Sequence, residues 1–245
     1  MIFKPRYGII VACDVYELET LKKLSRELAD LEFIVGFKLG IDLVLKSGLY
    51  KTVEVIREYT DKPLLYDHQK YGTDIPEVCG GEILKIIKEA GVDGLIIFPH
   101  AGIKTLKATV EGCHSHGLTP IVGGVMTHQG FLVKEGGYIE DNAPERAIRD
   151  AVKLGVEHFV LPGNRVELMR RLKEIIVSHI DEPKILFPGV GSGQGGNIKE
   201  AFQSTLPAPS YAIVGRGIYS SRDMKKAARD LWRKVEGLLI NRKEY

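Results

Sequence analysis

Three charged side chains lie close together in residues 67–74. Asp67 precedes Lys70 by three residues, and Asp74 follows it by four. Because each charge has an opposite neighbour, each favours the ionised form of the next. The group follows the apolar run 63–66, which is typical of a buried strand, and a lysine held cationic at the end of such a strand is a candidate catalytic group. The alternative is a solvated loop with no chemical role, and the three residues alone leave both interpretations open.

A second candidate group, rich in glycine, follows two later apolar runs. Residues 188–197 come after the run 184–187 and open a helical segment, while Gly215 and Arg216 follow the run 211–214. Glycines leave backbone N–H groups open to a ligand, and a helix N-terminus favours an anion. Arginine grips a phosphate with two parallel hydrogen bonds. A glycine-rich loop alone is often only a turn, but the two loops with an arginine predict a phosphate site.

The elements that would position these groups are eight short apolar runs. They are residues 8–12, 33–37, 63–66, 95–98, 120–125, 158–161, 184–187 and 211–214. The runs are continuous and do not alternate, as expected of parallel strands buried on both faces. Helical patterns lie between them, at 18–31, 83–89, 104–116, 144–153, 166–177 and 223–239. Gly91 and Gly155 each follow a helical pattern and suit the left-handed position after a helix.

Strand–helix units repeated eight times in 245 residues predict an α/β protein with a single (β/α)₈ (TIM) barrel, residues 1–245 forming one domain. An open, doubly wound sheet is the competing architecture. In a barrel, the loops that follow the strands share one face, and sites are built there. Asp14, Lys38 and residues 67–74 would then meet on that face with Thr127 and Arg216.

Composition narrows the class of protein. The formal net charge is +2, from 34 basic and 32 acidic residues, which predicts no nucleic-acid surface. Three cysteines at unrelated spacings form neither a zinc pattern nor a disulfide framework and favour a reducing compartment. No apolar run has the length of a membrane span, and the N-terminal residues lack the pattern of a signal peptide. We therefore expect a cytoplasmic protein with no membrane partner and no metal site.

The candidate groups resemble one known family across nearly the whole chain. The matching segments are 12–14 (ACD), 37–40 (FKLG), the Asp67/Lys70/Asp74-Ile75 cluster, 126–128 (MTH), 188–191 (PGVG) with 194–196 (QGG), and 214–219 (VGRGIY). In their order and their placement after strands, these segments resemble the orotidine 5′-monophosphate decarboxylases. The resemblance implies decarboxylation of orotidine 5′-monophosphate to UMP, the last step of de novo pyrimidine synthesis, without a cofactor.

The resemblance also implies roles for the charged residues. Lys70 resembles the lysine that stabilises the C6 carbanion and protonates it, and Asp67 resembles the aspartate beside the substrate carboxylate. Lys38 resembles the lysine that holds the first aspartate and a ribose hydroxyl, and Asp14 resembles the ribose-binding aspartate. Asp74 resembles the residue that a homodimer donates to the partner's active site.

The remaining implied residues bind the base and the phosphate. Thr127 stands where the family has a serine that reads the pyrimidine edge, and Gln194 resembles the glutamine between pyrimidine and phosphate. Gly215 and Arg216 resemble the phosphate grip. The other implied substrate-binding residues are Ile75, Pro188, Gly189 and Gly195.

Two alternatives remain. One is a sugar-phosphate decarboxylase or aldolase of the same superfamily, although these enzymes typically carry a glutamate on strand two and use magnesium, where this chain has Lys38. The other is a non-catalytic nucleotide-binding barrel that uses only the phosphate grip. The cluster D-x-x-K-x-x-x-D is two residues longer than the usual D-x-K-x-x-D, and Ser192 and Gly193 precede Gln194 where one residue is usual.

Overall fold

Eight parallel strands close into one barrel in chain order, with β8 hydrogen-bonded to β1. The computed structural model describes residues 2–68, 71–191 and 195–240. The strands are β1 (Tyr7–Cys13), β2 (Ile34–Gly40), β3 (Leu64–Asp67), β4 (Gly94–Ile97), β5 (Thr119–Gly123), β6 (His158–Val160), β7 (Lys184–Phe187) and β8 (Ser210–Val214). The predicted (β/α)₈ barrel is confirmed, and the open sheet is excluded.

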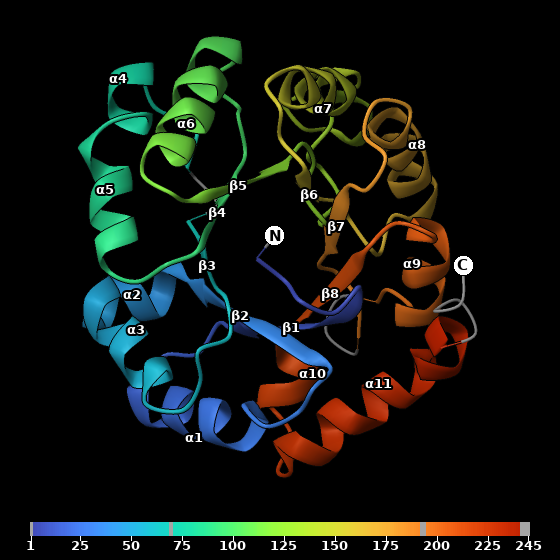
Figure 1. Cartoon of the computed structure of the whole chain (residues 1–245). Coiled ribbons are helices and arrows are strands. Elements are labelled where there is room, and N and C mark those ends of the chain that lie inside the picture. The colour runs from blue at the N-terminus through green and yellow to red at the C-terminus, as the bar shows by residue number, and fades with distance from the viewer. Residues whose placement is uncertain (1, 69–70, 192–194, 241–245) are drawn as a thin grey trace.

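Helices surround the barrel on its outer side (Figure 1). They are α1 (Leu18–Leu28), α2 (Ile41–Ser47), α3 (Leu49–Arg57), α4 (Pro76–Cys79), α5 (Glu82–Glu89), α6 (Ile103–Ser115), the 3₁₀ helix η1 (Val133–Glu135), α7 (Ala143–Lys153), α8 (Val166–Val177), α9 (Ile198–Thr205), α10 (Arg216–Tyr219) and α11 (Met224–Ile240). Within the described ranges, none of these helices combines the length and apolar character needed to cross a membrane.

The helix predictions differ from the structure in several places, which include the end of α1 and the segment between β2 and β3. The predicted helix 18–31 ends at Leu28, and Leu31 is buried in the turn that follows. The helices α2 and α3 were not predicted, because Gly48 lies between them at φ +79° and interrupts the apolar spacing. Gly91 and Gly155 have φ values of +92° and +78°, which confirms their left-handed conformation.

Alternate side chains along each strand divide the core in two, because successive residues of a strand point to opposite faces. One buried cluster fills the barrel and includes Leu65, Ile96 and Ile213. The other lies between the barrel and the helices and includes Phe37 and Leu95. The barrel therefore has a packed interior, and space for a ligand remains where the inward-facing residues become polar.

The N-terminal segment closes one end of the barrel. Phe3 is 1% exposed, and its ring centroid lies 4.4 Å from that of Tyr211, near the start of β8. Figure 1 shows the segment that leads into β1 inside the ring of strands. The opposite end, where the strands finish, is the one that can hold a substrate.

His158 lies beside Phe3 at the closed end, with ring centroids 6.3 Å apart. Its Nε2 atom is buried and has no hydrogen-bond partner among the described residues. Burial, and next the charge of Lys184, lower the pKa of His158 to about 4. The imidazole is therefore neutral in the folded protein at neutral pH.

We expect the protein to lose stability as pH falls from about 6.5 to about 4, by up to about 3 kcal/mol through this residue. The unfolded chain binds a proton at His158 in this range and the folded chain does not, so acid favours unfolding. Urea unfolding at pH 7 and pH 4.5 measures the effect, with His158→Phe as the comparison. An equal loss of stability in the variant would show that other groups cause it.

Candidate active site

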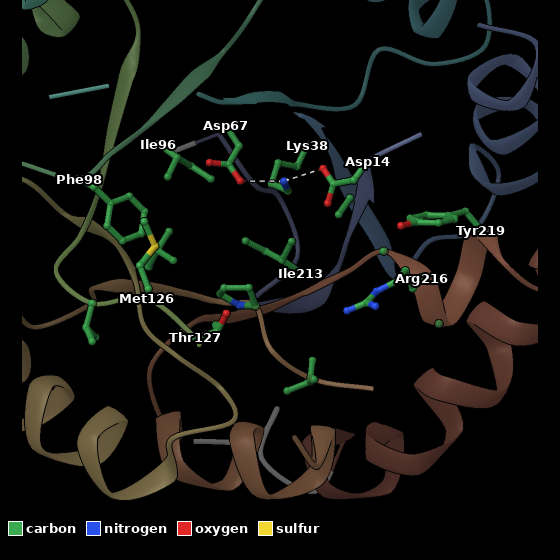
Figure 2. A pocket seen from close by; sticks show the side chains of 17 residues that line it. Asp14, Lys38, Asp67, Ile96, Phe98, Met126, Thr127, Ile213, Arg216 and Tyr219 are labelled. Atoms are coloured by element: carbon green, nitrogen blue, oxygen red, sulfur yellow. Dashed lines mark hydrogen bonds and ion pairs between the residues drawn. The ribbon is translucent and has the colours of Figure 1, made fainter. Parts of the chain in front are cut away.

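One buried lysine joins the first three strands at the open end of the barrel. Lys38 lies within β2, where its backbone pairs with Ala12 of β1 and Leu65 of β3. Its Nζ atom donates to Oδ2 of Asp67 at 2.7 Å and to Oδ1 of Asp14 at 3.0 Å. Figure 2 shows both carboxylates pointing toward this ammonium group. Three strands that are adjacent in the barrel thus place three charges in one network.

The network is unevenly buried. The side chains of Lys38 and Asp67 are each 8% exposed, whereas that of Asp14 is 42% exposed. Burial opposes the charge of Lys38, but the carboxylates of Asp67 and Asp14 outweigh it and raise the pKa of the lysine above its ordinary value. Lys38 is therefore a permanent cation, suited to holding negative groups in place and not to giving up a proton.

Asp67 keeps one oxygen available for another partner. Its Oδ1 atom is buried and accepts no hydrogen bond from any described residue. A buried carboxylate oxygen without a partner is costly, because it has lost its water. This oxygen could therefore accept from a further donor or cation next to Asp67.

Gly40 allows Asp14 to approach the lysine. A Cβ atom at this position would lie 2.5 Å from Oδ1 of Asp14, which is closer than such contacts occur. Gly40 ends β2 and pairs with Asp67 in the neighbouring strand. The absence of a side chain at Gly40 thus helps to define the position of the first carboxylate.

The network forms one wall of a cavity of about 130 Å³. Across the cavity lie Arg216, at the start of α10 after β8, and Thr127, in the loop after β5 (Figure 2). Pro188, which follows β7, also lines the cavity. A second recess of about 440 Å³ shares Asp14, Lys38, Asp67 and Met126 with the first and extends toward Asp42, Thr73 and His100. A ligand with an anionic end at Arg216 and a polar end at Lys38 would fit this distribution of charge.

In the loop after β7, the backbone at Gly189 lies very close to Asn164 and Thr127. Gly189 has a φ of +93°, and a Cβ atom there would lie 2.8 Å from Oδ1 of Asn164 and 3.1 Å from Cγ2 of Thr127. Its carbonyl accepts a hydrogen bond from the N–H of Gly196 at 3.1 Å. The loop therefore packs directly against the loops after β5 and β6, and a side chain at Gly189 would separate them.

The structure brings most of the predicted site residues together. Those that line the cavity are Asp14, Lys38, Asp67, Thr127, Pro188, Gly215 and Arg216. Gly189 packs against Thr127, which lines the cavity, and Gly195 has the left-handed φ of +78°. The predicted Lys70 and Gln194 lie outside the described residues.

Asp74 and Ile75 lie outside the cavity. Asp74 is exposed, and its Oδ1 accepts from the N–H of Ile75 at 2.7 Å. The hydroxyl of Thr105 donates to the carbonyl of Asp74 at 2.9 Å. The side chain of Ile75 is 57% exposed at the start of α4. Within one chain these two residues face solvent.

Sequence reasoning missed the apolar part of the site. Ile96, Phe98, Val160 and Ile213 line the cavity, and Figure 2 shows Tyr219 near Asp14. Position along the strand was the available signal, because residues two apart face the same side. That signal was weak here, since both faces of these strands are apolar.

The ammonium group of Lys38 bridges the carboxylates of Asp14 and Asp67. In the described part of the chain, no three His, Cys, Asp or Glu side chains are grouped so as to hold a metal ion. Cys13, Cys79 and Cys113 are buried free thiols.

Comparison with known proteins gives consistent matches over most of the chain. Residues 8–231 match the family described as orotidine 5′-phosphate decarboxylase / HUMPS. An orotidine 5′-phosphate decarboxylase of Pyrococcus abyssi is 30% identical over 230 residues, covering 94% of this chain and 99% of that protein. One of Methanosarcina barkeri is 29% identical, covering 93% of this chain and 94% of that protein.

Two solved structures share the arrangement of the barrel. The orotidine 5′-monophosphate decarboxylase of Methanocaldococcus jannaschii, solved with the inhibitor BMP, has a TM-score of 0.79 and 27% identity, covering 91% of this chain and 96% of that one. The orotidine 5′-phosphate decarboxylase of Pyrococcus horikoshii has a TM-score of 0.76 and 27% identity, covering 94% of this chain and 99% of that one.

Proposed function

The chain belongs to the orotidine 5′-phosphate decarboxylase / HUMPS family, and we propose that it converts orotidine 5′-monophosphate to UMP and carbon dioxide. The observation that carries the proposal is the Asp14–Lys38–Asp67 network facing Arg216 across one cavity. A nucleoside monophosphate has a phosphate for Arg216 and ribose hydroxyls for Asp14 and Lys38. The relatives reported above carry the same activity in their names.

The reaction requires a cation next to the reacting carbon. The bond between C6 and the carboxylate breaks, and its electron pair stays at C6, in the plane of the ring, where the π system cannot accept it. We assign Lys70 to stabilise this pair and then to transfer its proton to C6. Its sequence neighbours Asp67 and Tyr71 are buried at the open end of the barrel, and Asp67 has an oxygen without a partner among the described residues. An ammonium group there would satisfy that oxygen.

The other groups hold the substrate in place. Arg216 and the N–H groups after β7 bind the phosphate, while Thr127 contacts the pyrimidine edge. Binding energy gained at the phosphate can be used to hold C6 against the charged residues. Asp67 and Asp74 keep Lys70 protonated through their charges.

The competing enzyme class is the sugar-phosphate decarboxylases and aldolases of the same superfamily. Lys38 argues against it, because this buried cation lies where those enzymes would need a carboxylate for a metal ion. A binding protein without activity would need Arg216 but would have no use for the costly burial of Lys38 and Asp67.

The test is loss of the ultraviolet absorbance of orotidine 5′-monophosphate in the presence of purified protein. The protein is first treated with a chelator and then desalted. Turnover that continues without added metal supports the proposal. Activity only on sugar phosphates in the presence of magnesium would support the competing class, and nucleotide binding without turnover would support a binding protein.

We also propose a homodimer whose active sites are shared. Exposed apolar side chains lie on or next to the helices that follow β2, β3 and β4, and α4 packs against α6. They are Leu45, Tyr50, Ile75, Val78 and Ile103. An apolar surface of this kind favours a protein contact. Asp74, exposed next to Ile75, would then reach the site of the partner.

Mixing two inactive variants tests the shared site. Lys70→Ala and Asp74→Ala are each expected to be inactive, whereas a mixed dimer has one complete site. We expect about a quarter of the wild-type rate after equal amounts exchange subunits, since half of the dimers are mixed and each has one of two sites intact. Subunit exchange is followed with differently tagged chains. Exchange without recovery of turnover would place Asp74 in its own chain's site.

A further inference from the structure

The segment that carries Met126 and Thr127 is held by the next loop and not by a strand. β5 ends at Gly123, so these residues make no ladder hydrogen bonds. Nη1 of Arg165 donates to the carbonyl of Met126 at 3.4 Å. Nδ2 of Asn164 donates to the carbonyl of Thr127 at 3.0 Å. Two successive carbonyls are thus held by two successive side chains of the loop after β6.

Glu135 fixes the arginine that makes the first of these contacts. Nη2 of Arg165 forms an ion pair with Oε1 of Glu135, at the end of η1. Their side chains are 16% and 19% exposed, so the pair is largely desolvated. The other oxygen of Glu135 accepts from the N–H of Leu132 at 3.4 Å. The carboxylate therefore connects η1 to the loop after β6 through a planar guanidinium with a defined direction.

We propose that Glu135 and Arg165 are positioning residues that place the segment of Met126 and Thr127 against the pyrimidine. One guanidinium nitrogen donates to Glu135 and another donates to the carbonyl of Met126. The position of η1 therefore determines the position of Met126 and Thr127. Neither Glu135 nor Arg165 lines the cavity, whereas Met126 and Thr127 do (Figure 2). The ion pair between Glu135 and Arg165 therefore affects the affinity for substrate through the contact with the base. It does not affect the contact with the phosphate. The inference rests on the proposed function for the identity of the base.

The test is Glu135→Gln, which keeps the shape of the side chain and removes its charge. A misplaced Thr127 costs about one hydrogen bond to the base, so we expect the inhibition constant of UMP and the KM of orotidine 5′-monophosphate to rise about tenfold. Ribose 5-phosphate lacks the base, and its inhibition constant should stay within about twofold. The kcat should change by less than about threefold, because bound substrate still contacts the charged network.

A neighbouring ion pair supplies the control. Glu145 of α7 and Arg171 of α8 are joined at 2.8 Å, and neither residue lines the cavity. Glu145→Gln should leave both inhibition constants unchanged. In a background of Arg165→Met, the further change Glu135→Gln should have no effect on the affinity for UMP, because the carboxylate of Glu135 reaches the carbonyl of Met126 only through the arginine and glutamine can still accept from the N–H of Leu132.

The outcomes separate this inference from the proposed function. Wild-type protein that binds UMP but does not turn over the substrate would refute the function, and the two inhibitors would still test the positioning by calorimetry. An unchanged affinity of Glu135→Gln for UMP would overturn the inference. Equal weakening of UMP and ribose 5-phosphate would also overturn it, since that result indicates a general distortion of the site. The inference would also be overturned if the wild-type protein bound UMP no more tightly than ribose 5-phosphate, because the base would then contribute nothing to affinity.

Discussion

Replacing Lys70 with alanine is expected to lower kcat by about 10⁴-fold or more. The variant loses the cation that stabilises the electron pair at C6 and the acid that protonates it. Each of these effects alone is worth about 10²-fold to 10⁴-fold, and both act at the same carbon. The phosphate grip at Arg216 is untouched, so UMP should still bind with an affinity that titration can measure.

Single-turnover absorbance assays measure the loss, and calorimetry with UMP measures the remaining affinity. Lys85→Ala is the control, because Lys85 pairs with Glu82 at 3.0 Å on the exposed surface of α5, away from the cavity. That variant should keep the wild-type rate. A Lys70→Ala protein within about tenfold of the wild-type rate would require another proton donor and would refute the assigned role.

Replacing Lys38 with methionine is expected to lower both activity and stability. Methionine fills a similar volume but leaves Asp67 buried without its cation, and breaking one side of a buried pair costs about 3 kcal/mol or more. Asp14 loses its anchor as well, so the ribose contact is misplaced. We expect kcat/KM to fall by about 10²-fold to 10³-fold and the free energy of unfolding to fall by about 3 kcal/mol.

Lys184→Met provides the matched control for this substitution. Lys184 has the same side-chain exposure as Lys38, 8%, but lies at the closed end of the barrel and pairs with Glu157 at 3.1 Å. Its replacement should affect urea unfolding without lowering kcat/KM for correctly folded protein. If Lys38→Met retained both the activity and the stability of the wild type, the network would have no part in holding the site.

The fold could be predicted because every strand of the barrel is buried on both faces and is therefore a continuous apolar run. The helices were harder to predict where a single residue interrupts the apolar spacing, as Gly48 does between α2 and α3. Lys38 was predicted just past the end of β2, but it lies inside the strand and is buried. When a charged residue points into the barrel and has apolar neighbours in the sequence, the sequence does not show whether the residue lies inside the strand or past its end.

The polar part of the site was easier to identify than the apolar part. Asp14 and Arg216 follow strands and Asp67 ends one, and their chemistry is visible in the sequence. Ile96 and Phe98 cannot be separated from outward-facing residues such as Leu95, because all are apolar. The contact between Glu135 and Arg165, 30 residues apart, depends on the path of a loop that no periodic pattern describes.

The most direct test of the account is the reaction run in D₂O with chelator-treated wild-type protein. Proton transfer to C6 from an ammonium group that has exchanged with solvent predicts UMP with one deuterium at C6, released together with one carbon dioxide per nucleotide. Nuclear magnetic resonance of the product, through loss of the H6 signal, measures this. Failure to form UMP, or turnover that begins only when magnesium is added, would contradict the account.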